Sequence, residues 1–258
     1  MLSGKQIAGS LIRNAVQRYY TLKENPAYFF DPAAVDHVLK FIQVLRHTSG
    51  DFGGQNFTLL PWQQFLIANI FGFKVKETGK RLITKVYIEV ARKNGKSELA
   101  GAIGNYLAFK DGEFGAEVYS VANTADQASV CWKAGASMAR QLTKESNVFQ
   151  KMVRIYDSTN NRILVNSEDS MSFFRPLASN SHVLDGLRPH GTIVDEYHEA
   201  PDDSVLRVME SGMGNRSQPL LFIITTAGFN VNGPCYQYRK TVVDILEGRK
   251  ENDNTFGL

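Results

Sequence analysis

The chain has little cysteine, no strong excess of charge and no long apolar run, and each shortage excludes a class of protein. Its two cysteines, Cys131 and Cys235, form neither a disulfide framework nor the paired spacing of a zinc site. No apolar run reaches about eighteen residues, the length of a membrane-spanning helix, so no membrane partner is expected. The N-terminus also lacks a short apolar stretch followed by a small-residue cleavage site. We therefore expect a reduced, cytoplasmic setting.

The size and charge of the chain favour one globular unit. At 258 residues, of which 43% are hydrophobic, the chain can bury a substantial core, and one large α/β domain is the natural expectation. The 29 basic and 26 acidic residues give a net charge of +3, a mild bias that does not by itself indicate nucleic-acid binding. The function must therefore be sought in local motifs.

The most informative segment is a short basic loop made of Arg92, Lys93, Asn94, Gly95, Lys96 and Ser97. An apolar, β-branched run precedes it and a segment with helical spacing follows it. Strand, tight loop and helix is the layout of a phosphate-binding loop, in which backbone N–H groups and the Lys hold phosphates and the hydroxyl binds Mg²⁺. The standard pattern has Gly where Val90 stands, and a solvated basic turn is the plain alternative.

A second motif lies where the apolar run Thr192-Ile193-Val194 ends in Asp195 and Glu196. Ligands of open α/β sheets bind at the carboxyl edge of the strands. The first acid would hold Mg²⁺, and the second would orient and deprotonate an attacking water. The plain alternative is an acidic pair that begins a turn before Pro201. Because both motifs occur in the order a nucleotide site requires, we favour the nucleotide site.

Apolar periodicity predicts the helices and strands around these motifs. Helices are expected at 7–19, 32–45, 61–72, 96–109, 125–136 and 204–209, and after Pro234. Strands are expected at 84–90, 117–122, 192–196 and 220–224, with antiparallel strands at 152–156, 162–165 and 172–175. Alternating strands and helices indicate an α/β fold, a mostly parallel sheet with helices on both faces and a small antiparallel insertion. We expect an N-terminal helical appendage at 1–55, an ATPase core at 56–229 and a C-terminal lid or linker at 230–258.

Motifs in a fixed order give the chain a resemblance to a known family. They are Pro61-Trp62-Gln63, the basic loop at 92–97, the run from Ile193 to Ala200, and Thr225-Thr226-Ala227-Gly228. Together they resemble the ATPase domain of the large terminase subunit of tailed bacteriophages, a DNA-packaging motor. The resemblance runs from about residue 55 to the end and implies a P-loop NTPase fold of the RecA-like (ASCE) type, with ATP and Mg²⁺ as cofactors. Val90 fits it, since terminases of this type commonly depart from the standard loop there.

The resemblance also implies roles for the motif residues. The nucleotide would be bound by Trp62, Gln63, Lys93, Asn94, Gly95, Lys96 and Ser97, with Gln63 at the adenine edge. Arg92 would approach the γ-phosphate, Ser97 and Asp195 would hold Mg²⁺, and Glu196 would activate water. Thr225 and Thr226 would couple hydrolysis to movement. Each role has a plain alternative: Gln63 as a helix cap, Arg92 as a surface charge, and the threonines as ordinary strand ends.

Ring motors of this kind usually take an arginine from the neighbouring subunit, a contribution of roughly 10³–10⁵ in rate in related hydrolases. The candidates are Arg140, Arg154, Arg162, Arg188 and Arg216, of which Arg188 and Arg216 come first. The implied partners are double-stranded DNA, a portal protein and procapsid, and a small terminase subunit. A pentameric ring is implied for the assembled motor and a monomer for the isolated chain, in the cytoplasm of an infected bacterium. Large terminases also carry a C-terminal nuclease domain, which we expect to be absent here, so no nuclease activity is predicted.

Three other interpretations start from the same residues. Asp195-Glu196-Tyr197-His198 also spells a DExH box, which makes a helicase or translocase ATPase domain the alternative function. A non-hydrolysing DNA-packaging scaffold would keep the fold as a docking platform, but the complete set of chemical groups argues against it. A metal site of His190, Asp195 and His198 is excluded, because His190 and Asp195 would lie at opposite ends of one strand, roughly 17 Å apart.

Overall fold

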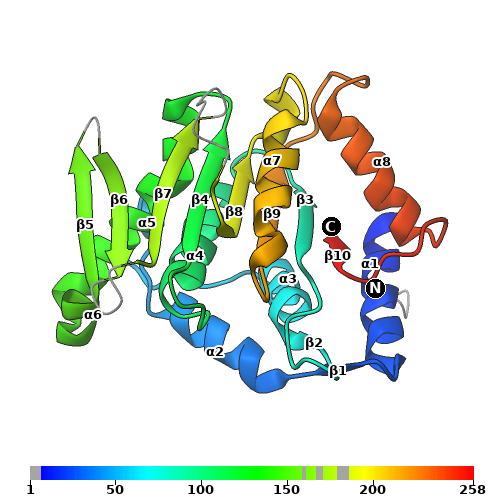
Figure 1. Cartoon of the computed structure of the whole chain (residues 1–258), viewed down its shortest axis with the longest axis horizontal. Helices are drawn as coiled ribbons and strands as arrows, with labels where there is room; N and C mark the ends of the chain where they lie inside the picture. Colours follow the sequence, from blue (N-terminus) through cyan, green and yellow to red (C-terminus); the bar gives the residue numbers. More distant parts are fainter. Residues whose placement is uncertain (1–6, 159–160, 167–170, 179–185) are drawn as a thin grey trace.

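An eight-stranded sheet forms the centre of the molecule in the computed structural model, which describes residues 7–158, 161–166, 171–178 and 186–258. The strand order is β10-β3-β9-β8-β4-β7-β6-β5 (Figure 1). The strands are β3 (Lys85–Glu89), β4 (Glu117–Ala122), β5 (Val153–Ser158), β6 (Asn161–Asn166), β7 (Phe173–Ala178), β8 (Pro189–Asp195), β9 (Leu220–Thr225) and β10 (Thr255–Gly257). Neighbours from β10 to β7 pair in parallel, and the pairs β7–β6 and β6–β5 are antiparallel. The predicted mostly parallel α/β sheet is confirmed.

Helices cover both faces of the sheet. Helices α4 (Lys96–Phe109) and α5 (Ala125–Glu145) pack on one face, and α7 (Ser204–Gly212) and α8 (Pro234–Leu246) lie on the other. Because side chains alternate along a strand, β9 serves both cores: Leu220 and Phe222 belong to the first, and Leu221 and Ile223 to the second. A strand buried on both faces must be apolar throughout, which explains the unbroken hydrophobic run that predicted it.

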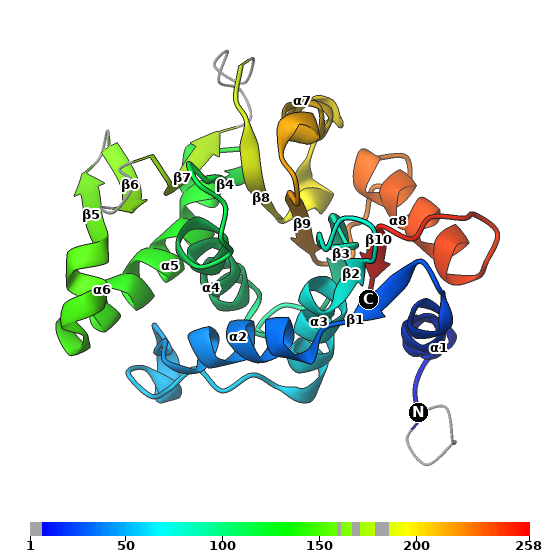
Figure 2. The ribbon, with the colours of Figure 1, turned by 60° about the horizontal axis from the view of Figure 1, so that its bottom comes forward.

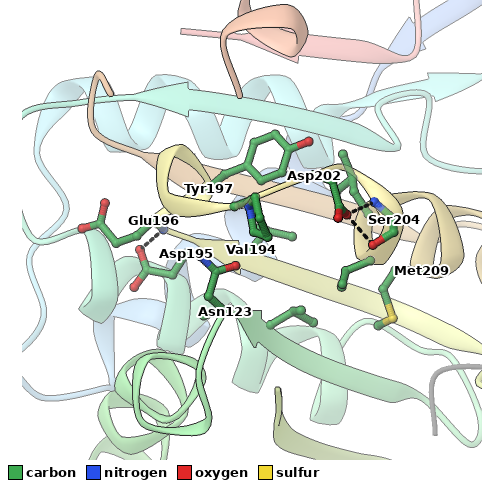
Figure 3. A pocket seen from close by; sticks show the side chains of 14 residues that line it. Asn123, Val194, Asp195, Glu196, Tyr197, Asp202, Ser204 and Met209 are labelled. Carbon is green, nitrogen blue, oxygen red and sulfur yellow. Dashed lines mark hydrogen bonds between the residues drawn. The ribbon is translucent and has the colours of Figure 1, made fainter. Parts of the chain in front are cut away.

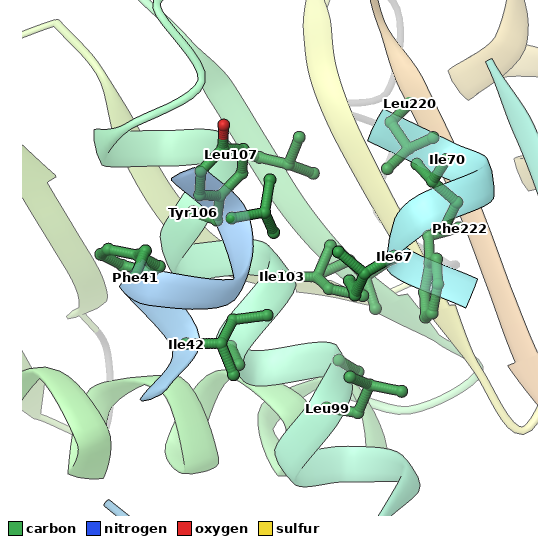
Figure 4. Close-up of a cluster of buried hydrophobic side chains, with 14 of the residues drawn as sticks. Phe41, Ile42, Ile67, Ile70, Leu99, Ile103, Tyr106, Leu107, Leu220 and Phe222 are labelled. Atoms are coloured by element: carbon green, nitrogen blue, oxygen red, sulfur yellow. The ribbon is translucent and has the colours of Figure 1, made fainter. Parts of the chain in front are cut away.

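The N-terminal helices belong to the main core. They are α1 (Ser10–Glu24), α2 (Pro32–Gln43) and α3 (Pro61–Gly72). Asp31 caps α2, since its carboxylate accepts hydrogen bonds from the N–H groups of Ala33 and Ala34. Figure 4 shows Phe41 and Ile42 of α2 beside the apolar side chains of α3 and α4. The expected boundary near residue 55 therefore does not separate two cores, because α2 buries its apolar face against the helix that follows the basic loop.

Helix α1 and strand β10 lie close together at one edge of the sheet. Figure 2 shows α1 beside α8 and β10, and Arg18 of α1 donates a hydrogen bond to the carbonyl of Thr255 at 3.3 Å. Residues 230–258, which the sequence predicts to be a lid or linker, contain α8, which covers the sheet, and β10, which extends it. A three-residue strand carries too short a pattern for the sequence to reveal its pairing.

The predicted small antiparallel insertion is present, and its strands extend the main sheet. The predicted hairpin is present as β5 and β6, and β7 pairs antiparallel with β6 but parallel with β4. Helix α6 (Asn147–Met152) and the small antiparallel sheet of β1 (Tyr28–Phe30) and β2 (Phe73–Val75) are further elements that the sequence does not predict. Among the described residues, none of the helices combines the length and apolar character required to cross a bilayer.

A buried ionic cluster holds the amino-terminal edge of the sheet. Both Nη atoms of Arg81 donate to the carboxylate of Asp111, at 3.0 and 2.9 Å, and His190 Nε2 lies 2.6 Å from the same carboxylate. The three side chains are at most 5% exposed. Arg81 precedes β3, Asp111 follows α4 and His190 lies in β8, so the cluster ties these elements together at the edge opposite Asp195.

Candidate nucleotide site

The candidate site lies at the carboxyl edge of the sheet, where three adjacent strands end. β3 runs into the basic loop, β8 ends at Asp195 and β9 ends at Thr225. The amide of Val90 donates to the carbonyl of Thr225, and the amide of Glu196 donates to that of Ile224, so β9 is tied to both neighbours at this edge. Parallel strand order thus brings together the motifs that are far apart in the sequence, at the place where open α/β sheets bind ligands.

The basic loop has the curved backbone of an anion-binding loop. Gly95 adopts φ +71° at the N-cap of α4, and Lys93 adopts φ +65°, which is uncommon for a residue with a side chain. Residues 91–95 are exposed, and among the residues that the structure describes no side chain caps the start of α4. These N–H groups and the positive end of the helix dipole favour a bound anion.

The loop and the acidic motif meet through two pairs of side chains. Lys96 Nζ lies 3.6 Å from Glu196 Oε1, and Ser97 Oγ lies 3.5 Å from Asp195 Oδ2. Lys96 is only 7% exposed, so its charge is directed into the site. Four of the five residues that the sequence assigns to catalysis and metal binding therefore lie together, although the two motifs are about a hundred residues apart in the chain.

Asp195 is a buried carboxylate with a thiol partner. Cys131 of α5 donates to Asp195 Oδ2 at 3.2 Å, and the amide of Glu196 donates to Asp195 Oδ1 at 3.0 Å. Burial raises the pKa of Asp195 above its ordinary value, and the charge of Glu196 acts in the same direction. Burial likewise raises the pKa of Cys131, which stays a thiol and donates its hydrogen. The sequence does not reveal the contact of Cys131 with the acidic motif.

The oxygen atoms of Ser97 and Asp195 fit Mg²⁺. A hydroxyl and one carboxylate, with waters and phosphate oxygens completing the octahedron, is the donor set that Mg²⁺ usually takes from proteins. The described residues contain no cluster of three or more His, Cys, Asp or Glu side chains suited to a metal ion. His190 lies in the ionic cluster at the opposite sheet edge, so the rejection of a His190–Asp195–His198 site is confirmed.

Glu196 is held in a strained backbone conformation. Its φ of +50° lies in the left-handed region, which costs a residue with a side chain about 1 kcal/mol or more. Oε2 lies 3.2 Å from His198 Nδ1 and 3.4 Å from the hydroxyl of Thr226. In the sequence, His198 is singled out only as a possible metal ligand and as part of the DExH box. Its contact with Glu196 becomes visible only in the structure.

Gln63 and Trp62 open α3 beside the loop. Gln63 Oε1 accepts a hydrogen bond from the amide of Leu60 at 2.8 Å, so the side chain does cap its helix. Its Nε2 faces the loop, 3.8 Å from where a β-carbon on Gly95 would stand. Trp62 is half-buried against the main core. The cap and a role towards a nucleotide are therefore compatible, because they use different atoms of one amide.

The arginines proposed for catalysis differ in exposure and in the contacts of their side chains. Arg92 lies exposed in the loop. Arg188 is exposed immediately before β8, at the edge opposite Asp195. Arg216 is 13% exposed and engaged with the carboxylates of Glu113 and Glu117 and the carbonyl of Gly115. The guanidinium of Arg216 thus links β4 to the segment before β9, whereas no such engagement holds Arg92 or Arg188 at their exposed positions in the described part of the chain.

A cavity of about 230 Å³ lies on the other side of the acidic motif, between β4, β8 and α7. Figure 3 shows Asp195 and Glu196 at one end of it and Asp202, bonded to Ser204, at the other. Its walls include Val194 and Met209, so it is largely apolar with acidic groups at the rim. The Glu196 carboxylate points away from this cavity, towards Lys96.

Taken together, a basic loop that opens a helix, with a lysine, a hydroxyl and two acids at the carboxyl edge of a parallel sheet, is the arrangement typical of the P-loop nucleoside triphosphatase fold. The family model "Terminase large subunit, ATPase domain" matches residues 61–244, and the chain belongs to this family of DNA-packaging ATPase domains. ATP hydrolysis is the activity that the family implies. The helicase alternative receives no support from this match.

Three known proteins resemble parts of the chain. The large terminase of HK97 bacteriophage superimposes with a TM-score of 0.68 at 20% identity, over 86% of this chain and 43% of that protein, and shares the fold. The ATPase domain of the Thermus phage P74-26 large terminase gives a TM-score of 0.49 at 18% identity, over 63% of this chain and 66% of that one. Protein YmfN of Escherichia coli (strain K12) is 50% identical over 74 residues, 29% of this chain and 16% of that protein. The chain thus spans less than half the length of the HK97 terminase and of YmfN.

Proposed function

We propose that this chain hydrolyses ATP with Mg²⁺ and uses the energy to move double-stranded DNA into a viral procapsid. One observation carries the proposal: Lys96 and Ser97 of the loop lie within 3.6 Å of Glu196 and Asp195 of the acidic motif. If the loop were only a solvated basic turn and the acids only the start of a turn, nothing would require their side chains to lie in contact. The matched family supports ATP as the nucleotide.

In the proposed site the loop binds the phosphates. The amides of Lys93, Asn94 and Gly95 and of the first turn of α4 donate to phosphate oxygens, and Lys96 neutralises the β- and γ-phosphates. Ser97 and Asp195 hold Mg²⁺, which screens charge on the phosphates when bound. Arg92 approaches the γ-phosphate from the exposed side of the loop. Trp62 and the Nε2 of Gln63 face the adenine.

Glu196 is the proposed general base. Its carboxylate orients a water in line with the γ-phosphate and takes the water's proton as the new P–O bond forms and the bond to ADP breaks. Lys96, at 3.6 Å, attracts the carboxylate and holds it close to the phosphates. Catalysis then consists mainly of positioning and charge stabilisation.

Assembly completes the site in this proposal. Arg188, exposed at the opposite sheet edge, is the arginine that one subunit offers to its neighbour in a homo-oligomeric ring, with a pentamer as the proposed form. An isolated monomer would then be nearly inactive. A portal protein, a procapsid and a small terminase subunit are the proposed partners, in the cytoplasm of an infected bacterium. Thr225 and Thr226 are the proposed coupling residues.

Nucleotide binding by a Lys96→Ala variant tests the proposal. We expect the variant to lose affinity for Mg²⁺-ATP by at least about tenfold, because a buried charge–phosphate interaction contributes well over 1.4 kcal/mol. Lys110→Ala, at the exposed far end of the same helix, is the matched control and should bind as the wild type does. Equal affinities for all three proteins would refute the phosphate-binding role of the loop.

A further inference from the structure

A histidine that the proposed mechanism does not use lies between the general base and the coupling strand. His198 sits in the short 3-10 turn η2 (Tyr197–Glu199), and its side chain is 11% exposed. Its Nδ1 lies 3.2 Å from Glu196 Oε2, 3.1 Å from Thr225 Oγ1 and 3.3 Å from Thr226 Oγ1. One ring nitrogen therefore reaches the carboxylate and both threonines.

The donors and acceptors around His198 indicate the direction of these hydrogen bonds. The Thr225 hydroxyl gives its one hydrogen to the Thr226 carbonyl at 3.0 Å and accepts the backbone N–H of His198 at 3.1 Å. The Thr226 hydroxyl gives its hydrogen to Glu196 Oε2. Since the Glu196 carboxylate, 3.2 Å from Nδ1, can only accept, we assign a hydrogen to Nδ1, and the Thr226 hydroxyl, 3.3 Å from this nitrogen, then accepts from it. Glu196 and the threonines thus share one N–H donor.

Packing makes this contact close and specific. A β-carbon added at Gly228 would stand 2.7 Å from the β-carbon of His198, nearer than real atoms approach. Neither atom is the end of a flexible side chain, so the absence of a side chain at Gly228 is what allows the segment after Thr226 to lie directly on His198. The imidazole is therefore clamped by β9 and its exit on one side and by Glu196 on the other.

We propose that His198 is a positioning residue that transmits the position of the Glu196 carboxylate to residues 225–228, the start of the β9–α8 connection. When Glu196 turns towards water at the γ-phosphate, Nδ1–H passes from the carboxylate to the threonine hydroxyls, and the Thr226 hydroxyl loses its acceptor. The segment that rests on His198 then rearranges. This inference rests on the proposed function, because it takes Glu196 as the base.

Amide hydrogen exchange of the full chain, with and without a non-hydrolysable ATP analogue and Mg²⁺, tests the inference. In the wild type we expect the analogue to change exchange in two segments, the loop at 91–99 and the β9 exit at 226–233. In His198→Ala the loop change should persist and the change at 226–233 should be lost. The variant should keep its affinity for the analogue while kcat falls by roughly ten- to hundredfold, the range for a misplaced catalytic group. His198→Asn, whose amide overlies Nδ1, should restore the exchange response.

Two further variants separate a positioning role from loss of structure. Gly228→Ala displaces His198 without removing it and should also abolish the response at 226–233. His37→Ala is the matched control, since His37 Nδ1 also bonds a hydroxyl, that of Tyr106 at 3.1 Å, away from the site. An unchanged response at 226–233 in His198→Ala would overturn the inference while leaving the nucleotide site intact. A wild type whose loop does not respond to the analogue would overturn the proposed function itself.

Discussion

Removal of one buried charge at the edge opposite the nucleotide site is predicted to destabilise the whole fold. Asp111→Asn keeps nearly the same volume but leaves the guanidinium of Arg81, 1% exposed, without its carboxylate. Breaking a buried ion pair in this way costs about 3–5 kcal/mol. For a chain of this size each kcal/mol lowers Tm by about 2–4 °C, so Tm should fall by about 6–20 °C. Calorimetry or denaturant unfolding measures the change.

The loss of stability in Asp111→Asn should depend on pH, because the Asp111 carboxylate titrates at a different pKa in the folded and unfolded chain. Burial alone would raise the pKa of Asp111, but the charge of Arg81 and the hydrogen bonds from His190 and Arg81 hold it below its ordinary value. The native state therefore binds fewer protons here than the unfolded chain does. The stabilisation is fully present above the unfolded pKa of about 4 and is lost as pH falls through the lower folded pKa. The stability gap between wild type and variant should narrow on acidification.

A matched control tests whether burial is the cause. Asp203→Asn removes the same group from an exposed pair with Arg207, whose side chain is 71% exposed. Exposed pairs contribute below about 1 kcal/mol, so its Tm should fall by less than about 4 °C. A loss for Asp111→Asn no larger than that of the control, or a gap that does not narrow in acid, would refute this reasoning.

Three more predictions follow from the packing and from the proposed site. Gly101→Ala should lower the free energy of unfolding by about 1–3 kcal/mol, because its β-carbon would stand 2.6 Å from the backbone nitrogen of Gly135 and push α4 off α5. Gly214→Ala, whose β-carbon would meet open space, should leave the free energy of unfolding unchanged. Gln63→Ala should reduce the preference for ATP over GTP in competition binding more than Gln64→Ala does, and equal effects would count against the adenine role. Arg188→Ala should keep nucleotide affinity but lose turnover by roughly 10³-fold or more, and mixing with Glu196→Gln subunits should restore part of it; full activity of Arg188→Ala alone would exclude it as the finger.

Elements with a strong local pattern are predicted well from the sequence. The helix expected at 96–109 and the strand at 117–122 have those limits in the structure, because burial and turn residues agree there. Thr124 is the N-cap of α5, where its hydroxyl accepts a hydrogen bond from the amide of Gln127. The acidic pair and the basic loop can be predicted to meet because parallel strands share a carboxyl edge.

Features that depend on distant contacts are not predictable in this way. β10 is a strand only because β3 offers a free edge, and its three residues carry no period of their own. The threonine partners of His198 lie at the end of β9, and the partners of Arg216 lie in the α4–β4 region. Neither set of contacts can therefore be predicted from the neighbouring sequence. The core shared by α2 and α4 likewise comes from packing, since each helix alone shows only an apolar face.

Hydrolysis of ATP by Glu196→Gln beside the wild type tests the central claim most directly. With Mg²⁺ and long double-stranded DNA, over a range of protein concentrations, the wild type should show turnover that rises faster than linearly with concentration. Glu196→Gln should bind Mg²⁺-ATP with wild-type affinity and show no turnover. Retained hydrolysis in the variant would contradict the assignment of the base, and a wild type that binds no nucleotide would contradict the site as a whole.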